Sequence, residues 1–349
     1  MKNIGILTLP FGENYGCVLQ AYALCTYFKK KGANPVLLRR GWNQQKKDSF
    51  IYKFKRYIYY NIIAYPIYKF YKRIPQTSLV RSSSELSNLI ISYHLDSVVV
   101  GSDQVWAIQN TRGANMDFFL CLDGLPANVT LYSYAASFGS DKWKGTDDET
   151  IKAKQSITRF SDVSVRELSG KQLCSSLFEI EAKVVLDPTL LLTKNDYITT
   201  KQLSVVSYKP SNTLVSYLLD ESREKIELCN ELSAQKHLIV KHLFRKYLGR
   251  HISVEDWLIN IAKADFVVTD SFHGMIFSII FERQFIVIPN IKRGETRFIS
   301  LLSLLGLQNR LIYNLNQDLS KLPFIDYSVV NKQLNILRED SYNFLNKLV

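Results

Sequence analysis

Short apolar segments alternate with longer amphipathic ones along both halves of the chain, and this rhythm restricts the folds open to it. In the first half, strands are predicted at 2–9, 35–38, 97–100, 130–135, 162–165 and 183–186. A helix predicted over 17–31 separates the first two strands. Because strand, helix and strand in this order form a parallel βαβ unit, the first half should build a parallel sheet covered by helices.

The pattern restarts in the second half. Strands are predicted at 213–219, 237–240, 266–268 and 285–288, with helices between them. A chain of 349 residues is long for one core, and the polar stretch 193–212 is typical of a domain junction. We therefore predict an α/β protein with two doubly wound, Rossmann-like domains facing a cleft. The predicted domains are 1–195 and 212–325, and a last helix at 326–349 is left free to return to the first domain.

Composition narrows the class of protein further. Hydrophobic residues make up 46% and charged residues 22% of the chain, no run is apolar enough for a membrane span, and the start does not resemble a signal peptide. A cytoplasmic protein is expected. The five cysteines are widely spaced without a CxxC pair, which argues against structural zinc and a disulfide framework. Glycine fingerprints of dinucleotide and P-loop sites are missing.

The formal net charge is +12, and much of it lies in one segment. Residues 46–73 hold eight Lys or Arg against one Asp, interleaved with seven tyrosines. This mixture favours an anionic membrane surface, where rings lie at headgroup level. Single-stranded nucleic acid and a solvated hairpin packed on the first domain remain alternatives. Nucleic acid ranks last, because no recognition motif accompanies the charge.

Residues 264–278 read as a buried strand that ends at Thr269-Asp270 and turns into a helix near Gly274. Polar groups beyond the carboxyl end of a strand and beside a helix amino end form the usual ligand site of open α/β sheets. An anion is the natural guest there, and His273 could exchange a proton near neutral pH. The alternative is that Asp270 and Ser271 cap the helix while His273 packs.

Six separated stretches together resemble the polysaccharide pyruvyl transferase family. They are Asn14-Tyr15-Gly16-Cys17-Val18-Leu19-Gln20-Ala21-Tyr22, Val100-Gly101-Ser102-Asp103-Gln104-Val105-Trp106, Ser133-Tyr134-Ala135-Ala136-Ser137-Phe138-Gly139, Val165-Arg166-Glu167, Leu186-Asp187-Pro188-Thr189 and Thr269-Asp270-Ser271-Phe272-His273-Gly274. Each is weak evidence alone, but their joint order is specific.

The resemblance implies a GT-B-like fold and transfer of pyruvate from phosphoenolpyruvate to a sugar hydroxyl pair as a ketal. Such enzymes act on bacterial capsule or exopolysaccharide, or on their lipid-linked precursors, so the expected partners are phosphoenolpyruvate and a lipid-linked or oligosaccharide acceptor. No metal or organic cofactor is expected. The enzyme would then work in the cytoplasm, with 46–73 holding it to the inner face of the membrane.

The resemblance also assigns roles to residues. His273 matches a histidine implicated in donor binding and proton transfer, and Arg166 matches an arginine that would pair with the donor anion. An ion pair with Glu167 or another acid is the alternative for Arg166. The remaining donor-side candidates are Ser271, Phe272, Gly274, Lys292, Arg293 and Arg297.

Asp103 and Asp270 join His273 as candidate acids and bases. The acceptor-side candidates are Asn14, Tyr15, Gly16, Gln20, Ser102, Gln104 and Trp106, the last as a stacking platform for a sugar ring. Helix capping and core packing are the competing interpretation of this N-terminal set.

One departure from the family pattern bears on the donor. Well-studied members carry an arginine two residues before the histidine, where this chain has Ser271. Lys292 and Arg293 could compensate, or backbone N–H groups and Arg166 could hold the anion. Two other functions therefore stay open: a GT-B-like glycosyltransferase that uses a nucleotide-sugar, and a non-catalytic polysaccharide- or membrane-binding module.

Overall fold

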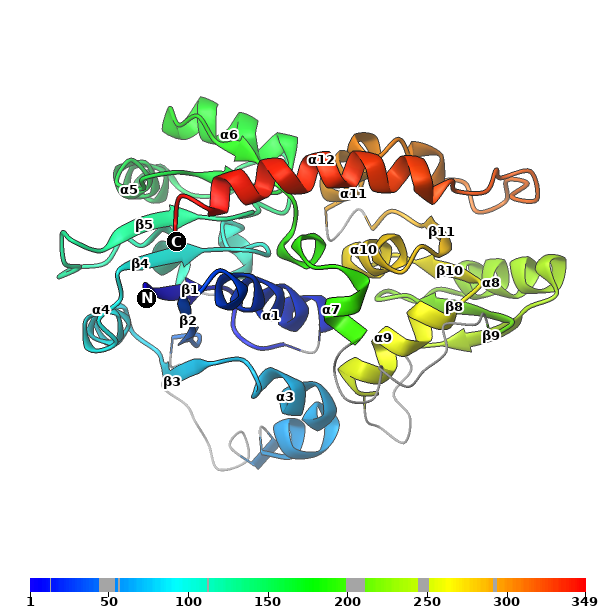
Figure 1. The fold of residues 1–349 in the computed structure, drawn as a ribbon, viewed down its shortest axis with the longest axis horizontal. Coiled ribbons are helices and arrows are strands. Elements are labelled where there is room, and N and C mark those ends of the chain that lie inside the picture. The colour runs from blue at the N-terminus through cyan, green and yellow to red at the C-terminus, as the bar shows by residue number, and fades with distance from the viewer. Residues whose placement is uncertain are drawn as a thin grey trace. The chain divides into compact units, whose positions relative to one another are not determined.

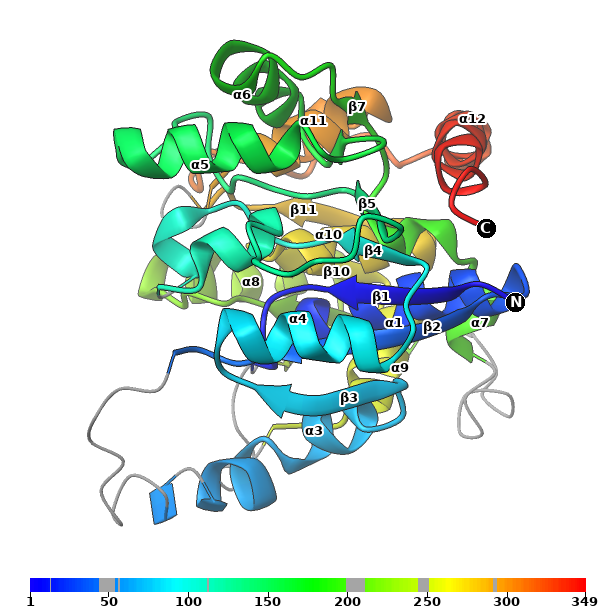
Figure 2. The same cartoon turned by 90° about the vertical axis from the view of Figure 1, so that its left-hand side faces the viewer.

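The computed structural model describes residues 1–12, 14–43, 54–55, 57–111, 113–198, 211–243, 251–290 and 294–349. The chain forms two compact units. Unit 1 comprises Met1–Lys53, Tyr71–Leu191 and Leu337–Val349, and unit 2 comprises Phe54–Phe70 and Leu192–Ile336. Figures 1 and 2 show the elements of each unit.

Unit 1 is built on a parallel sheet with strand order β3-β2-β1-β4-β5. Its strands are β1 (Asn3–Leu7), β2 (Asn34–Arg40), β3 (Gln76–Val80), β4 (Ser97–Val100) and β5 (Thr130–Ser133). The short strands β6 (Ser164–Val165) and β7 (Lys183–Val184) pair with each other, and single parallel bridges join β6 to the end of β5. The order reverses at β1, which marks a doubly wound sheet.

Helices cover both faces of this sheet (Figure 2). They are α1 (Tyr15–Lys30), α4 (Ser83–Ser92), α5 (Asp147–Ile157) and α6 (Leu168–Phe178), with 3₁₀ turns η2 (Ile108–Asn110), η3 (Asn115–Phe119) and η4 (Pro188–Leu191). α4 and α5 share one buried cluster with β1, β4 and β5, while α1 lies on the other face. Capping boxes start α4 at Ser82 and α5 at Thr146.

Unit 2 holds a second parallel sheet with order β11-β10-β8-β9. Its strands are β8 (Thr213–Tyr217), β9 (Ile239–His242), β10 (Phe266–Thr269) and β11 (Gln284–Val287). Its helices are α7 (Lys194–Ile198), α8 (Arg223–Lys236), α9 (Val254–Lys263), α10 (Phe272–Ile280) and α11 (Thr296–Leu304), with the 3₁₀ turn η6 (Gln308–Arg310).

The two faces of the unit 2 sheet have separate cores. Apolar side chains of α8 pack with alternate residues of β8, β10 and β11 on one face. An edge-to-face chain of rings formed by Tyr217, Trp257 and Phe277 joins β8, α9 and α10. All four β10 residues are buried, as expected for a central parallel strand.

Two helical segments lie where the chain passes, in sequence, from one unit to the other. The π-helix η1 (Tyr59–Ile63) and most of α3 (Tyr65–Tyr71) group with unit 2. Residues 46–73 were predicted to belong to the first domain; in their described part, residues 54–70 group with unit 2 and residues 71–73 with unit 1. The last helix, α12 (Tyr327–Leu345), begins in unit 2 and belongs to unit 1 from Leu337 onward.

Candidate active site

The carboxyl ends of the unit 2 strands lead into three helix starts. β8 is followed by α8, β10 by α10 and β11 by α11. Because the strands are parallel, these helix starts lie on the same edge of the sheet. Unpaired N–H groups and the helix dipole give such an edge a positive potential, which favours an anionic ligand.

His273 lies in the first turn of α10 and is almost completely buried. Its ring meets the ring of Phe272 edge to face at 5.5 Å between centroids. The guanidinium of Arg297, from the first turn of α11, lies 5.2 Å from the centroid of the same Phe272 ring. A titratable imidazole and a fixed cation therefore contact one phenyl ring, which fixes both side chains near the start of α10.

Ser271 and Gly274 have structural roles in this turn. The Ser271 hydroxyl caps α10 by accepting the Gly274 N–H at 3.3 Å. A Cβ at Gly274 would lie 2.3 Å from the Thr269 hydroxyl oxygen, so only glycine lets the helix approach β10 this closely. The helix-capping interpretation of Ser271 therefore agrees with the geometry, and neither residue offers a charged group to a donor.

Asp270, a predicted acid or base, has a buried carboxylate that holds the loop after β8. It accepts the backbone N–H groups of Leu219 and Asp220 and forms a 2.7 Å ion pair with Lys225. A carboxylate with these partners braces the strand end, which argues against a role as the proton acceptor. Lys225 was not among the predicted site residues, although its place in the first turn of α8 puts a cation at this edge.

Arg166 follows β6 in unit 1, and its side chain is only 2% exposed. It donates to Asp187 at 2.7 Å, and the carboxylates of Glu167 and Asp103 lie 3.9 Å and 4.0 Å away. Burial acts to lower the pKa of Arg166, but these three carboxylates, Asp187 foremost, hold it above its ordinary value. The structure thus favours the ion-pair alternative for Arg166 over the predicted donor contact.

Other motif residues of unit 1 extend this buried network. Ser102 donates its hydroxyl to Asp187, and its N–H donates to the Gln20 side chain, which in turn donates to Thr8. Gly101 before it has a φ of +138°, and a Cβ there would lie 2.0 Å from the Tyr134 carbonyl oxygen. Gln20 and Ser102 join strand ends to α1, and the acceptor contact predicted for them stays a prediction.

Asp103 is the most accessible carboxylate of this network, with its side chain 16% exposed. It accepts the N–H of Gln104, and the Gln104 side chain accepts a hydrogen bond from Asn110. Burial, together with the neighbouring Asp103, holds the pKa of the Cys17 thiol well above its usual range. Because the Asp103 carboxylate is partly exposed, Asp103 and the neighbouring Gln104 remain candidates for contact with an acceptor.

The start of α1 has the geometry of a helix cap. Asn14 accepts the N–H of Gly16 at 2.9 Å as the N-cap, and Tyr15 is buried. These contacts match the capping alternative, and the acceptor role predicted for Asn14, Tyr15 and Gly16 stays a prediction.

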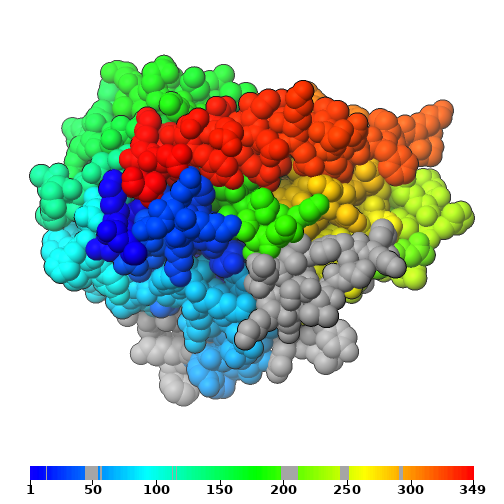
Figure 3. All heavy atoms as spheres, viewed as in Figure 1, coloured from blue at the N-terminus to red at the C-terminus, as the bar shows by residue number. Residues whose placement is uncertain are grey.

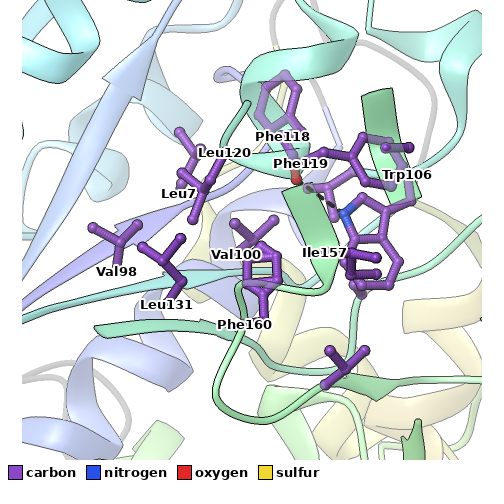
Figure 4. Close-up of a cluster of buried hydrophobic side chains, with 14 of the residues drawn as sticks. Leu7, Val98, Val100, Trp106, Phe118, Phe119, Leu120, Leu131, Ile157 and Phe160 are labelled. Carbon is purple, nitrogen blue, oxygen red and sulfur yellow. Dashed lines mark hydrogen bonds between the residues drawn. The ribbon is translucent and has the colours of Figure 1, made fainter. Parts of the chain in front are cut away.

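Trp106 was predicted to stack on a sugar, but it lies inside the unit 1 core (Figure 4). Its indole is fully buried, stacks on Phe119 at 5.3 Å and donates to the Phe118 carbonyl oxygen at 2.9 Å. No face of the ring is open to a ligand. A Trp beside a strand end can pack into the core as readily as it can face a ligand site. This prediction needs correction.

The predicted donor residues Lys292 and Arg293 lie outside the described residues. Within the described ranges, no group of three His, Cys, Asp or Glu side chains could hold a metal ion. Across the same ranges, no helix combines the length and apolarity that a bilayer span demands.

Comparison with solved structures identifies the fold class of the chain. Structures of UDP-N-acetylglucosamine 2-epimerases match nearly the whole chain: one from Neisseria meningitidis bound to UDP-GlcNAc (9% identity, 97% of this chain, 92% of that chain, TM-score 0.51), one from Methanocaldococcus jannaschii (13%, 97%, 100%, 0.50) and a putative one from Listeria monocytogenes (10%, 98%, 98%, 0.50). At these identities the likeness shows the fold alone. The predicted fold class, two Rossmann-like domains of the GT-B kind, is confirmed.

A family model then identifies the chain more closely. The model for polysaccharide pyruvyl transferase matches residues 14–292. The chain belongs to this family and is a transferase. No match was found among curated protein sequences.

Proposed function

We propose that the protein transfers pyruvate from phosphoenolpyruvate to a hydroxyl pair of a sugar during bacterial capsule or exopolysaccharide synthesis, on the cytoplasmic side of the membrane. The family supports the reaction class. The observation that carries the donor assignment is the pair of side chains, His273 and Arg297, that contacts the Phe272 ring at the amino end of α10.

Phosphoenolpyruvate carries a carboxylate and a phosphate, so its site needs fixed cations and N–H donors. The first turns of α10 and α11 supply N–H groups, and Arg297 supplies a planar cation suited to bidentate binding of either anion. In this proposal, Arg297 replaces the arginine that the family carries two residues before its histidine. The cation comes from α11 in place of the turn before α10, where Ser271 serves as the cap.

The proposed chemistry conserves atoms and charge. A proton from His273 adds to the methylene carbon of phosphoenolpyruvate, and the first sugar hydroxyl forms a bond to the central carbon as it loses its own proton. The second hydroxyl then displaces phosphate and closes the ketal, and its proton leaves with the phosphate. Arg297 stabilises the negative charge that develops on the leaving group. After it has given up its proton, the His273 imidazole can accept the proton of the first sugar hydroxyl, which restores its starting state.

The donor assignment is tested by calorimetric titration of phosphoenolpyruvate into the wild type, His273→Gln and Arg297→Met. We expect saturable binding by the wild type and at least tenfold weaker binding by Arg297→Met, since one charge-assisted contact is lost. Arg223→Met is the matched control: Arg223 is a largely exposed arginine on α8 of the same unit, so its replacement should leave binding unchanged.

Two results would contradict the proposal. Saturable binding of a UDP-sugar without any binding of phosphoenolpyruvate would identify a nucleotide-sugar donor. Binding of neither ligand, alone or with acceptor present, would favour a non-catalytic role.

A further inference from the structure

The helical segment 54–73 carries apolar and basic side chains on its outer surface. Tyr65 and Lys69 are exposed and lie four residues apart on α3, so they share one face of that helix, and Ile62 in η1 is exposed as well. Lys55, Tyr57 and Arg73 are also exposed. The segment is part of the molecular surface (Figure 3).

The opposite face fixes the segment to its surroundings. Ala64, Ile67 and Phe70 are buried, again at intervals of three residues. The carbonyl oxygen of Ile63 accepts the N–H of His251 at 3.1 Å, and the rings of Tyr60 and Tyr68 pack at 5.4 Å between centroids. Because the inner face already supplies the packing, the large apolar side chains on the outer face are not needed for it.

Large apolar side chains are exposed along this segment. Tyr57 is 64% exposed, Tyr65 46% and Ile62 41%. In the sequence, residues 54–70 include Lys55, Arg56 and Lys69 but no Asp or Glu, so this part of the segment has a net positive charge. Rings that carry a polar tip, next to lysines that can extend past them, match the boundary between lipid headgroups and acyl chains.

We propose that this outer face, defined by Lys55, Tyr57, Ile62, Tyr65 and Lys69, docks the protein on an anionic lipid bilayer. The charge complementarity selects anionic headgroups, and the apolar side chains enter the interface between them. The docking surface does not depend on the donor. Only the corollary that the acceptor is lipid-linked rests on the proposed function.

The test is flotation of the full chain with vesicles of phosphatidylcholine containing 30% phosphatidylserine, compared with pure phosphatidylcholine. We expect binding to the anionic vesicles only, and its loss in high salt. One basic residue near such a surface is worth about 1 kcal/mol, or about fivefold in affinity. Lys55→Gln/Lys69→Gln should therefore bind at least tenfold more weakly.

A second variant tests the apolar part. Tyr57→Ser/Ile62→Ser/Tyr65→Ser should also weaken binding at least tenfold, even though its charge is unchanged. The controls replace exposed residues of the same kinds elsewhere: Lys142→Gln/Lys144→Gln for charge, and Tyr93→Ser/Ile151→Ser/Leu168→Ser for apolar surface. Both controls should stay within twofold of the wild type.

Failure of the wild type to float, or equal losses in the test and control variants, would overturn the proposal. Binding of a single-stranded oligonucleotide in place of vesicles would overturn it as well. Calorimetry with phosphoenolpyruvate on the Lys→Gln variant separates the two proposals. Unchanged donor binding with lost flotation supports the docking surface, and flotation without any donor binding leaves the surface intact while removing the proposed donor.

Discussion

The two sheet edges that carry the family motifs use charge in different ways. In unit 1, Arg166 is buried among Asp187, Glu167 and Asp103, so its charge is satisfied by the protein itself. In unit 2, Arg297 and His273 contact an aromatic ring, and the helix starts around them add positive potential. The first edge forms a brace between strand ends. The second edge also has a brace, in Asp270 and Lys225, but its His273 and Arg297 lie at helix starts, where an anion would bind.

This difference shows that a motif residue and a ligand-binding residue are not the same thing. Asp187 accepts hydrogen bonds from Arg166, which follows β6, from Ser102, which follows β4, and from Thr189, which lies in η4. Such a network needs fixed residue types at fixed places in order to fold, whether or not it contacts a substrate.

The largest stability effect is expected for Arg166→Met. It leaves the Asp187 and Glu167 carboxylates buried without their cation, which should cost about 3–5 kcal/mol in the free energy of unfolding. Urea denaturation followed by tryptophan fluorescence measures it, with Arg223→Met as the exposed control. A loss below about 1 kcal/mol would mean that the brace is unimportant and would return Arg166 to the list of donor ligands.

His273→Gln should act on catalysis and spare the fold. Loss of a positioned proton donor is expected to lower the transfer rate about 10²–10⁴-fold, with little change in the urea midpoint. Transfer of labelled pyruvate to a surface-glycan acceptor measures the rate. A variant with a near wild-type rate would remove His273 from the mechanism.

Asp270→Asn should destabilise unit 2 while leaving the donor contacts in place. It weakens hydrogen bonds from Leu219, Asp220 and Lys225 to a charged acceptor, and one such bond contributes about 1.5–3 kcal/mol. Denaturation followed through Trp257 fluorescence reports on this unit. If stability is unchanged and transfer is abolished, Asp270 is the acid or base that the sequence suggested.

Alkaline pH should affect unit 1 more than unit 2. Burial raises the pKa of Cys25 and Cys174 in unit 1, and of Cys229 in unit 2, from 9.0 to about 12. Above pH 9 the unfolded chain releases these protons and the folded chain keeps them, so stability is full below pH 9 and falls as the pH rises from 9 towards 12.

The expected loss is about 1.4 kcal/mol per thiol for each pH unit in that window. Urea denaturation of Trp257→Phe reports on unit 1 through the remaining tryptophans. Equal pH dependence of the signals from the two units would contradict this difference between them.

Much of the architecture could be predicted from the sequence. Buried parallel strands such as β4 and β10 are short apolar runs, and helices such as α9 have the periodicity of amphipathic segments. β3 and α4 were not predicted. The sequence of β3, Gln76–Val80, shows little alternation between polar and apolar residues, and it lies beside the tyrosine-rich insertion. Edge strands with mixed burial give the weakest pattern.

The candidate site was harder to predict, for a physical reason. Spacing in the sequence places His273 at a helix start, but it does not show which carboxylates already have hydrogen-bond or ion-pair partners within the protein. Whether Asp270 pairs with Lys225, or Arg166 with Asp187, depends on side chains that are 45 and 21 residues apart in sequence. Trp106 illustrates the same limit, because a residue beside a strand end can point into the core as well as out of it.

The most direct test of the contrast between the edges compares two arginine substitutions in one assay. Phosphoenolpyruvate is titrated calorimetrically into Arg297→Met and into Arg166→Lys, which keeps the buried positive charge of unit 1. The account predicts at least tenfold weaker binding, about 1.4 kcal/mol, for Arg297→Met and an unchanged affinity for Arg166→Lys. Lost binding in Arg166→Lys with normal binding in Arg297→Met would place the donor's anion contact at the unit 1 edge and contradict the account.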